Sequence, residues 1–354
     1  MEIRSFKKTF DAQLQIYVKK KIREAQKIAS RPRTQQILAY IDDAVFAAGK
    51  RLRPYLIYTS YMLYGGKATK EVMHFSQSAE LIHTMALIHD DIIDKGEMRH
   101  GKPCFYKFAS DIFPSAPNKD HLGISQALLV WDLIFARAYE VIHSQYKLPA
   151  ANLLAAQKHM HIMIQEVVAG QMIDVDNMNG DHVDLVKLEA KNHYKSGQYS
   201  FTRPLVTWAL LAGAPAKAIK ALEKIGELLG KAYQMRDDIL DVTFVEWWDT
   251  AYYDNKTKFS DIQDGQQTYL TNYIYEHGSY AHRLAVSRAM WKRLSHEQIK
   301  ELRDVFISSW AVEYGKELLF GYLEASKKLI AKLAVVKTEY KKHLYEIIGM
   351  LETL

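Results

Sequence analysis

Proline placement is the feature of this 354-residue chain that most constrains its fold, because all eight prolines lie at or before Pro215. Nothing after that point removes a backbone hydrogen bond as proline does, and strong helix formers dominate the remainder. The segment after Pro215 carries apolar residues at a three-four spacing, at Ile219, Leu222, Ile225, Leu228 and Leu229. This spacing predicts a long amphipathic helix.

Turn signals divide the rest of the chain into further helical segments. Stretches rich in proline, glycine or polar residues occur at 30–33, 64–67, 113–118, 177–181 and 256–267. None of them resembles an interdomain linker, and alternating strand patterns are scarce. We therefore expect one all-α domain over residues 1–354, a bundle of roughly ten or more helices whose inward faces carry the site.

Composition limits the functions that the chain can have. A net charge of +6 without an arginine-rich patch disfavours nucleic acid and leaves an anionic small ligand as the simpler partner. The lone Cys104 excludes an internal disulfide and a cysteine-based zinc cluster. No window reaches the roughly 18 consecutive apolar residues of a membrane span, and the first residues lack a signal-peptide core. We expect a cytoplasmic protein with no membrane span.

Three carboxylates lie within five residues in the stretch LIHDDIID, at Asp90, Asp91 and Asp94. On a helix, Asp90 and Asp94 share one face, and Asp91 points about 100° away. Like charges at this spacing repel. One such cluster alone would be explained equally well by an exposed acidic helix end.

A second copy of the arrangement makes that simpler explanation less satisfactory. Asp237, Asp238 and Asp241 repeat Asp-Asp-x-x-Asp inside another helical apolar pattern. Mg²⁺ prefers oxygen ligands and bridges a few carboxylates to phosphate oxygens. The two motifs therefore predict a magnesium-dependent diphosphate site. The cations Lys50, Arg51 and Arg53 in GKRLRP, with Arg99 after the first motif, would complete it, although a basic run alone is usually surface.

Together these segments resemble the trans-isoprenyl diphosphate synthases, the family of farnesyl and geranylgeranyl diphosphate synthases. The resemblance runs over roughly residues 45–270, through GKRLRP, HTMALIHDDIID, MRHGKP, VAGQMIDV, KSGQYSFTRPL, GKAYQMRDDILD and DIQDGQQT. It implies an isoprenoid-synthase helical bundle around a central cavity, a homodimer, and transfer of an allylic group to isopentenyl diphosphate. It also implies three Mg²⁺ ions per active site.

The resemblance assigns roles by position. The implied magnesium ligands are Asp90, Asp91, Asp94, Asp237, Asp238 and Asp241, with Asp90, Asp94, Asp237 and Lys195 as the catalytic set. The implied isopentenyl diphosphate contacts are Lys50, Arg53, His83 and His100. The implied allylic diphosphate contacts are Arg99, Lys195, Ser196, Gln234 and Lys258. Gln171 and Asp174 match a further family pattern whose role stays open.

The implied chemistry agrees with these residue types. Metal ions and Lys or Arg side chains stabilise a departing diphosphate, so that the allylic carbon–oxygen bond can ionise. The isopentenyl double bond then attacks the cation, and the released diphosphate takes the final proton. An apolar pocket excludes water that would quench the cation.

Three positions depart from the family pattern. His100 stands where a second arginine is usual, Gln266 stands where a lysine is usual, and Ser196 replaces a threonine. The first two changes remove fixed positive charge and predict weaker diphosphate binding. They also keep a second interpretation open, a non-catalytic subunit that regulates a partner synthase. A class I terpene cyclase is a further alternative, but the acidic second motif is of the elongating type.

The resemblance implies that product length depends on the fifth and fourth residues before the first aspartate, which are Met85 and Ala86 here. In the family these two residues form the floor of the pocket that holds the growing prenyl chain, and large aromatic rings there favour short products. Alanine leaves space, and methionine is long but adaptable. We expect a C20 product, with C15, C25 or longer as alternatives.

Overall fold

Helices make up most of the computed structural model, which describes residues 2–47, 49–67, 69–178, 184–243 and 258–354. Sixteen α-helices lie in these ranges, together with the π-helix η1, the short 3₁₀-helix η3 and a two-stranded hairpin. The predicted all-α fold is confirmed, and its helix number agrees with the expected ten or more.

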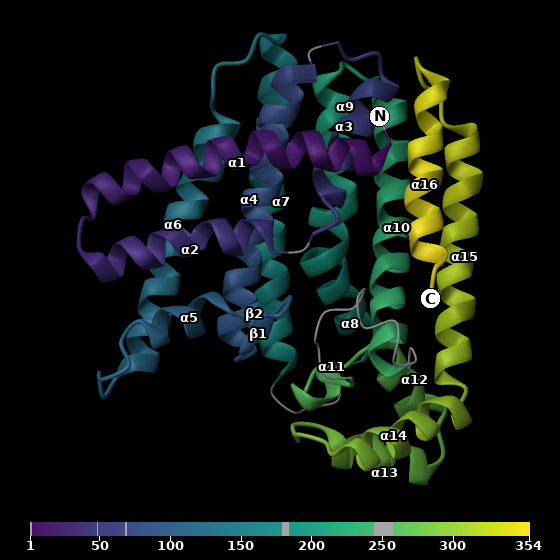
Figure 1. Ribbon diagram of the computed structural model, residues 1–354. Helices are drawn as coiled ribbons and strands as arrows, with labels where there is room; N and C mark the ends of the chain where they lie inside the picture. The colour runs from purple at the N-terminus through teal and green to yellow at the C-terminus, as the bar shows by residue number, and fades with distance from the viewer. Residues whose placement is uncertain (1, 48, 68, 179–183, 244–257) are drawn as a thin grey trace.

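The first half of the chain forms the side of the bundle on which α1 and α2 cross in front of α4, α6 and α7 (Figure 1). The elements are α1 (Ile3–Ile28), α2 (Pro32–Phe46), α3 (Leu52–Leu63), α4 (Thr69–Ile93), β1 (Met98–Arg99), β2 (Lys102–Pro103), α5 (Phe105–Asp111), α6 (Lys119–Ile142) and α7 (Ala150–Asn177). Two of the predicted breaks, at 64–67 and 113–118, fall between helices, and the break at 30–33 covers the end of the α1–α2 connection and the first two residues of α2. The fourth follows the end of α7, and part of it lies outside the described residues.

The second half contains the long helix expected after Pro215. Its elements are α8 (Leu185–Asn192), η1 (His193–Thr202), α9 (Arg203–Leu211), α10 (Ala216–Val242), α11 (Ser260–Gln263), α12 (Tyr269–His277), α13 (Tyr280–Ala289), α14 (His296–Ser308), α15 (Ala311–Lys332), η3 (Thr338–Tyr340) and α16 (Lys341–Glu352). Leu222, Ile225 and Leu229 are fully buried on α10, as the spacing predicts. The last predicted break, at 256–267, contains α11, and residues 256–257 lie outside the described ranges.

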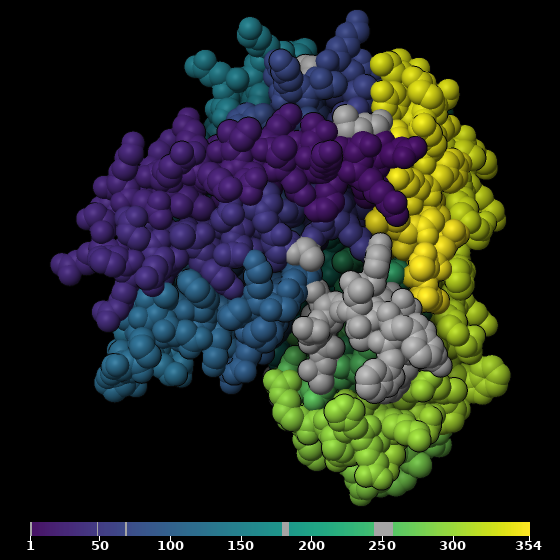
Figure 2. All heavy atoms as spheres, in the orientation of Figure 1, coloured from purple at the N-terminus to yellow at the C-terminus, as the bar shows by residue number. Residues whose placement is uncertain are grey.

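One contiguous cluster of buried apolar side chains joins the ends of the chain. It includes Phe6 on α1, Tyr55 on α3, Trp208 on α9, Phe306 on α14 and Leu344 on α16. Helices α10, α15 and α16 stand side by side in Figure 1, with α13 and α14 at the lower end of the molecule. In the space-filling view of Figure 2, α1 covers the upper front face. The core therefore fixes the helices from which site residues project.

The β1–β2 hairpin immediately follows the first acidic motif. Arg99 pairs with Lys102 across it, and the two residues between them, His100 and Gly101, both have positive φ, 53° and 75°. Positive φ at both central positions is the signature of a type I′ turn, which glycine adopts readily. The turn folds Arg99 back toward the end of α4.

The close contacts of η1 with α7 and α10 occur at glycine residues. A Cβ placed on Gly230 of α10 would lie 2.6 Å from the Cα of Gly197 in η1, and a Cβ on Gly170 of α7 would lie 2.3 Å from the backbone nitrogen of Lys195. Both distances are shorter than van der Waals contact allows. Glycine at these positions therefore lets α7 and α10 press against η1.

We predict that Gly230→Ala lowers the free energy of unfolding by about 1 to 3 kcal/mol, because the added methyl must push η1 and α10 apart. Gly321→Ala on α15 is the matched control, since no atom lies within 4 Å of its added Cβ. That control should be neutral or stabilise the protein by up to about 1 kcal/mol through helix propensity. Urea unfolding of both variants measures the difference, and equal stabilities would contradict the packing argument.

Candidate active site

The first acidic motif lies at the carboxyl end of α4, where each of its first two carboxylates meets a cation. Asp90 Oδ1 is 3.0 Å from Lys195 Nζ, which comes from η1. Asp91 is buried and accepts hydrogen bonds from Arg99 Nε at 2.9 Å and from a terminal nitrogen of Arg99 at 2.6 Å. Arg99 also reaches Asp90 at 3.5 Å. The structure thus commits Asp91 to Arg99, whereas Asp90 is shared between two cations.

Asp94, just beyond the helix end, has the least compensated carboxylate of the motif. Its Oδ1 is buried and has no hydrogen-bond partner among the residues that the structure describes. Burial and the neighbouring charge of Asp90 raise the pKa of Asp94 to about 7. An oxygen that is buried, unpartnered and repelled by a second carboxylate is suited to a cation as its missing partner.

The second acidic motif projects from α10, and its three carboxylates also differ in their contacts. Asp238 is buried and accepts hydrogen bonds from Gln234 Nε2 at 2.8 Å and from the backbone nitrogen of Tyr269 at 3.1 Å. Asp241 accepts hydrogen bonds from the backbone nitrogen and the hydroxyl of Ser260, both at 3.0 Å. Asp237 is the most accessible of the three, with 43% of its side chain exposed.

Proximity of negative charge also raises the pKa values in this second motif. Burial, followed by repulsion from Asp261, raises the pKa of Asp238 to about 8 and that of Asp241 to about 7. Both carboxyls therefore favour protonation or a bound cation more strongly than exposed aspartates do.

The π-helix η1 connects the two acidic motifs. It packs against α7 and α10, and its Lys195 reaches Asp90 on α4. The same helix carries Ser196, half-buried, and the buried residues Tyr199 and Ser200. Helices of the π type widen the turn and often occur at functional sites. Here the wide turn presents a lysine, a serine and a tyrosine from one short segment.

Lys195 also binds a second acid, Asp174 on α7. Its Nζ donates to Asp174 Oδ2, and that same oxygen accepts from Gln266 Nε2 at 3.2 Å. Lys191 Nζ lies 3.3 Å from Asp174 Oδ1. Although burial raises the pKa of Asp174, the charges of Lys191 and Lys195 outweigh that effect and lower it overall. For Lys195 the effects have the opposite sign. Burial lowers its pKa, but the charges of Asp90 and Asp174 raise the pKa overall, so this lysine is charged.

The basic run at the start of α3 separates into two roles. Arg51 is buried, and it pairs with Asp11 at 2.6 Å and Glu80 at 2.5 Å, so it holds α1, α3 and α4 together. Arg53 instead donates to Tyr199 and Ser200 of η1, both at 2.6 Å. Lys50 is exposed, and its charge interacts with Arg236 and Asp237 of α10. Lys50 thus lies near the second acidic motif and Arg53 lies against η1, and their roles as ligand contacts remain predictions.

His83 joins this group through the Tyr199 hydroxyl, which lies 3.3 Å from His83 Nδ1. Burial, with the nearby charges of Arg53 and Arg99, lowers the pKa of His83 well below its ordinary value. The imidazole is therefore neutral. His100, in the hairpin turn, is close enough to contribute to this effect.

The remaining predicted residues occupy the expected elements. Lys258 Nζ donates to the carbonyl oxygen of Leu240 at 2.8 Å, next to the second motif. Met85 is buried on α4, and Ala86 is partly buried beside it. Gln171 on α7 has a buried Nε2 that lacks a hydrogen-bond partner within the described ranges. Their assignments to substrate or product remain predictions.

Among the residues that the structure describes, no three Asp, Glu, His or Cys side chains form a ready-made metal site. Mg²⁺ does not require one, because it keeps several waters and is usually held by one or two carboxylates together with substrate phosphates. The unpartnered oxygen of Asp94 and the accessible carboxylate of Asp237 fit that mode of binding.

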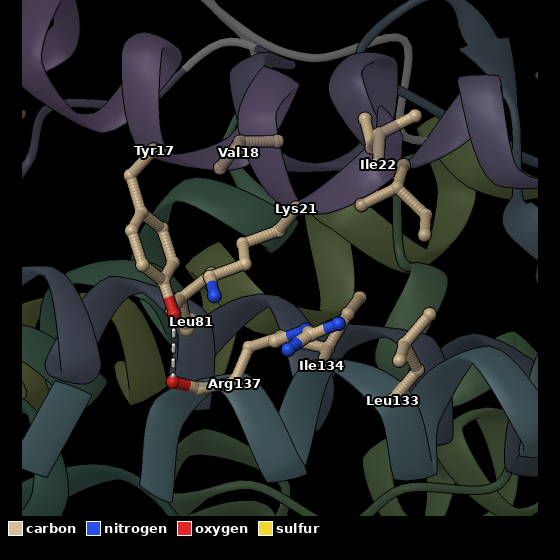
Figure 3. A pocket seen from close by; sticks show the side chains of 9 residues that line it. Tyr17, Val18, Lys21, Ile22, Leu81, Leu133, Ile134 and Arg137 are labelled. Carbon is tan, nitrogen blue, oxygen red and sulfur yellow. Dashed lines mark hydrogen bonds between the residues drawn. The ribbon is translucent and has the colours of Figure 1, made fainter. Parts of the chain in front are cut away.

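A separate apolar pocket lies between α1, α4 and α6. In Figure 3, Tyr17, Val18 and Ile22 face Leu133 and Ile134, and the Tyr17 hydroxyl donates to the carbonyl oxygen of Arg137 at 3.2 Å. The pocket contains none of the predicted diphosphate residues. Its lining residue Leu81 lies four positions before Met85, so both residues occupy the same face of α4.

Comparison with known proteins decides the family. The Polyprenyl synthetase profile matches residues 34–306. The chain belongs to the polyprenyl synthetase family. It is a prenyltransferase, which confirms the resemblance noted in the sequence.

Individual relatives of this polyprenyl synthetase are similar to it in sequence along most of its length. A geranylgeranyl pyrophosphate synthase from Geoglobus acetivorans is 29% identical over 80% of each chain. A geranylfarnesyl diphosphate synthase from Aeropyrum pernix is 26% identical over 84% of this chain and 88% of its own. The crystal structure of geranylgeranyl pyrophosphate synthase from Corynebacterium glutamicum, complexed with isoprenyl diphosphate and magnesium, is 23% identical and superimposes with a TM-score of 0.90, covering 100% of this chain and 99% of its own. This last similarity establishes the fold.

Sequence reasoning missed two members of the site. Tyr199 connects Arg53 to His83, but a tyrosine inside a helical pattern is usually core. Lys191 lies four residues before Lys195, a spacing that puts both lysines on one helix face and could have indicated a pair. Its partner on α7 could not be deduced from that spacing.

We predict that pH affects the metal-free polyprenyl synthetase through Asp94. Because its pKa is higher folded than unfolded, the folded state keeps a proton that the unfolded chain releases, and stability falls as pH rises from about 4 to about 7. Asp94→Asn should reduce this fall by on the order of 1 kcal/mol. Urea unfolding between these pH values measures it, with exposed Asp304→Asn on α14 as control. Parallel curves for wild type and Asp94→Asn would contradict the assignment.

Proposed function

We propose that the chain, as a single polyprenyl synthetase domain over residues 1–354, condenses isopentenyl diphosphate with an allylic diphosphate to an all-trans prenyl diphosphate and releases diphosphate. The observation that carries this proposal is the position of η1, which packs against α10 and pairs Lys195 with Asp90 of α4. Element η1 therefore contacts α10, which carries the second motif, and a carboxylate of the first motif. Such a site is suited to an anion that arrives with its own metal ions.

Residues of this chain stabilise the leaving group in the proposed reaction. Lys195 and Arg99 are charged and lie at the first acidic motif, where they can follow the negative charge that develops on the departing diphosphate. Gln234 and Lys258 border the second motif. As the allylic carbon–oxygen bond breaks, its electron pair leaves with the diphosphate oxygen. The isopentenyl double bond then forms the new carbon–carbon bond.

Isopentenyl diphosphate would bind at Lys50, Arg53 and His100, of which Arg53 and His100 lie close enough to His83 to add to the lowering of its pKa by burial. Arg53 is held in place by Tyr199 and Ser200, so its guanidinium needs little reorganisation. The neutral His83 can donate a hydrogen bond without adding charge. The proton lost from the product leaves with the released diphosphate, as in the resembling family.

Asp90, Asp94 and Asp237 are the residues that we propose to hold Mg²⁺, with Asp238 and Asp241 behind Asp237 and with three ions per site as the family resemblance implies. Bound magnesium would supply charge neutralisation for the leaving diphosphate. Asp91 is included in the predicted ligand set, but its contacts support a role in anchoring Arg99.

We propose a C20 product. The buried Met85 and the smaller Ala86 line α4 one turn before the first motif, and the Geoglobus acetivorans relative is named for a C20 product. The Aeropyrum pernix relative is named for the longer geranylfarnesyl product, so C25 is the principal competitor.

We propose a homodimer that covers an exposed apolar surface on α6 and α7. Its members are Leu128, Leu129, Tyr139, Leu154, Val168, Met172 and Val175. Helix α6 is long and apolar enough to cross a membrane by length and composition, although a single such helix is weak evidence, and only 28% of its most apolar window is buried. A second copy of the chain accounts for this surface in a cytoplasmic enzyme without a membrane span.

The test of the function is a product assay with Mg²⁺, labelled isopentenyl diphosphate and, separately, dimethylallyl, geranyl and farnesyl diphosphates. Asp90→Ala and Asp237→Ala should each lower kcat by about 100-fold or more, because a ligand to the leaving-group metal is lost. Asp304→Ala, exposed on α14, is the control and should keep full activity. No prenyl product from the folded wild type with any starter would instead favour a regulatory subunit or a cyclase.

Product length is tested at Met85. We predict that Met85→Phe shortens the product, because a rigid ring fills the space below the first motif where a flexible thioether now lies. Chromatography of the dephosphorylated products gives the length directly. Met350→Phe on α16 makes the same exchange away from α4 and should leave the product unchanged. An identical product from Met85→Phe would assign the floor of the pocket to another residue.

A further inference from the structure

Lys191 is a buried lysine beside the proposed site that the mechanism above does not use. It is 8% exposed, on the last turn of α8. Its Nζ donates to Gln266 Oε1 at 3.2 Å and to the carbonyl oxygen of Gln267 at 3.3 Å, and it lies 3.3 Å from Asp174 Oδ1. Burying a lysine is unfavourable unless its charge is paired. Asp174 provides that charge.

Asp174 has more positive charge around it than one carboxylate needs. It is 1% exposed, and its two oxygens face Lys191 on one side and Lys195 on the other. Lys195 is also divided, since it pairs with Asp90 as well. Of these two lysines, only Lys195 contacts the first acidic motif in the described part of the chain.

The two lysines therefore differ in what they can do when a diphosphate binds. If Lys195 turns toward a phosphate oxygen, it must give up part of its interaction with Asp174. A buried carboxylate that loses its only counter-ion is strongly unfavourable. Lys191, which stays with Asp174 through its contacts to Gln266 and Gln267, removes that obstacle.

We propose that Lys191 is a positioning residue that serves as the standing counter-ion of Asp174 and thereby frees Lys195 to bind the diphosphate. The inference rests on the proposed function, in which Lys195 contacts the allylic diphosphate. Lys191 itself acts through Asp174 and touches no substrate atom. Without it, Asp174 holds Lys195 more tightly and the diphosphate binds less well.

A substitution at Gln266 can separate the effect of the Lys191 charge on Asp174 from the effect of the hydrogen bonds that Lys191 makes. Its Nε2 donates to Asp174 Oδ2 at 3.2 Å. A lysine at position 266 would therefore approach the same carboxylate from the segment between α11 and α12. The double variant Lys191→Met/Gln266→Lys keeps the net charge and returns a cation to Asp174. It does not restore the hydrogen bonds that Lys191 makes to Gln266 and Gln267.

The experiment measures the Kd of inorganic diphosphate with Mg²⁺ by titration calorimetry, together with the KM for farnesyl diphosphate and the melting temperature of each variant. Lys191→Met should weaken diphosphate binding by about tenfold and raise KM more than it lowers kcat. Lys187→Met is the matched control, because Lys187 is exposed on the same helix one turn earlier. It should bind like the wild type. Lys191→Met/Gln266→Lys should recover most of the lost affinity, whereas Gln266→Lys alone should bind diphosphate like the wild type, because Lys191 already neutralises Asp174 there. A Gln266→Lys variant that binds more tightly than the wild type would show that the introduced lysine contacts the diphosphate itself, and its gain would then be subtracted from the rescue.

Two results would overturn the inference. The first is a Kd for Lys191→Met equal to that of Lys187→Met. The second is a double variant that binds as weakly as Lys191→Met, since that would make Lys191 a structural link between α8 and residues 266–267. If Lys191→Met does not fold, Lys191→Gln takes its place and the same comparisons decide.

The outcome for Lys191 is separable from the outcome for the proposed function. If the diphosphate Kd values of the wild type and the variants follow the expected order but the wild type makes no prenyl product, the proposed function is refuted and the role of Lys191 is supported. Wild-type protein that elongates normally, with equal diphosphate affinity in all variants, would support the proposed function and refute the role of Lys191.

Discussion

The structure of the site depends on one cation, the ammonium group of Lys195, held between Asp90 of α4 and Asp174 of α7. Those acids come from different helices, and Lys195 is the side chain that pairs with both of them. Lys195 reaches both because η1 lies close against α7, and a side chain at Gly170 would prevent that approach. A glycine contact in the core thus determines where the most important charge of the site is placed.

Charge pairing then extends outward from this centre. Arg99 neutralises Asp91, Lys191 supports Asp174, and Arg53 is held by Tyr199. Asp94 is the exception, because in the described part of the chain its buried Oδ1 has neither a hydrogen bond nor an ion pair, and burial raises its pKa to about 7. Buried charges are tolerated when they are paired, so the uncompensated member of a paired set marks the position where a cation from outside is needed. This arrangement agrees with a prenyltransferase that works on a metal-bound diphosphate.

The helical architecture was largely predictable because its causes are local. The spacing of Leu222, Ile225 and Leu229 is sufficient to predict α10, and the glycine and proline clusters at 30–33, 64–67 and 113–118 mark the ends of helices correctly. The basic run was harder, since three neighbouring cations looked equivalent. Arg51 forms buried ion pairs with Asp11 and Glu80, whereas Arg53 donates to η1, and these partners come from elements far away in the sequence.

The sequence alone determined the fold class, the two acidic motifs and the family, since these rest on residue type and spacing along one helix. Only the tertiary structure decided which carboxylate keeps which cation. Asp91 and Asp90 are adjacent in sequence, yet one is committed to Arg99 and the other is shared with Lys195. Lys191 and Gln266 meet at Asp174 from segments far apart in the chain. Ion pairing depends on distance in space and on burial, and neither quantity is contained in the spacing of residues within one helix.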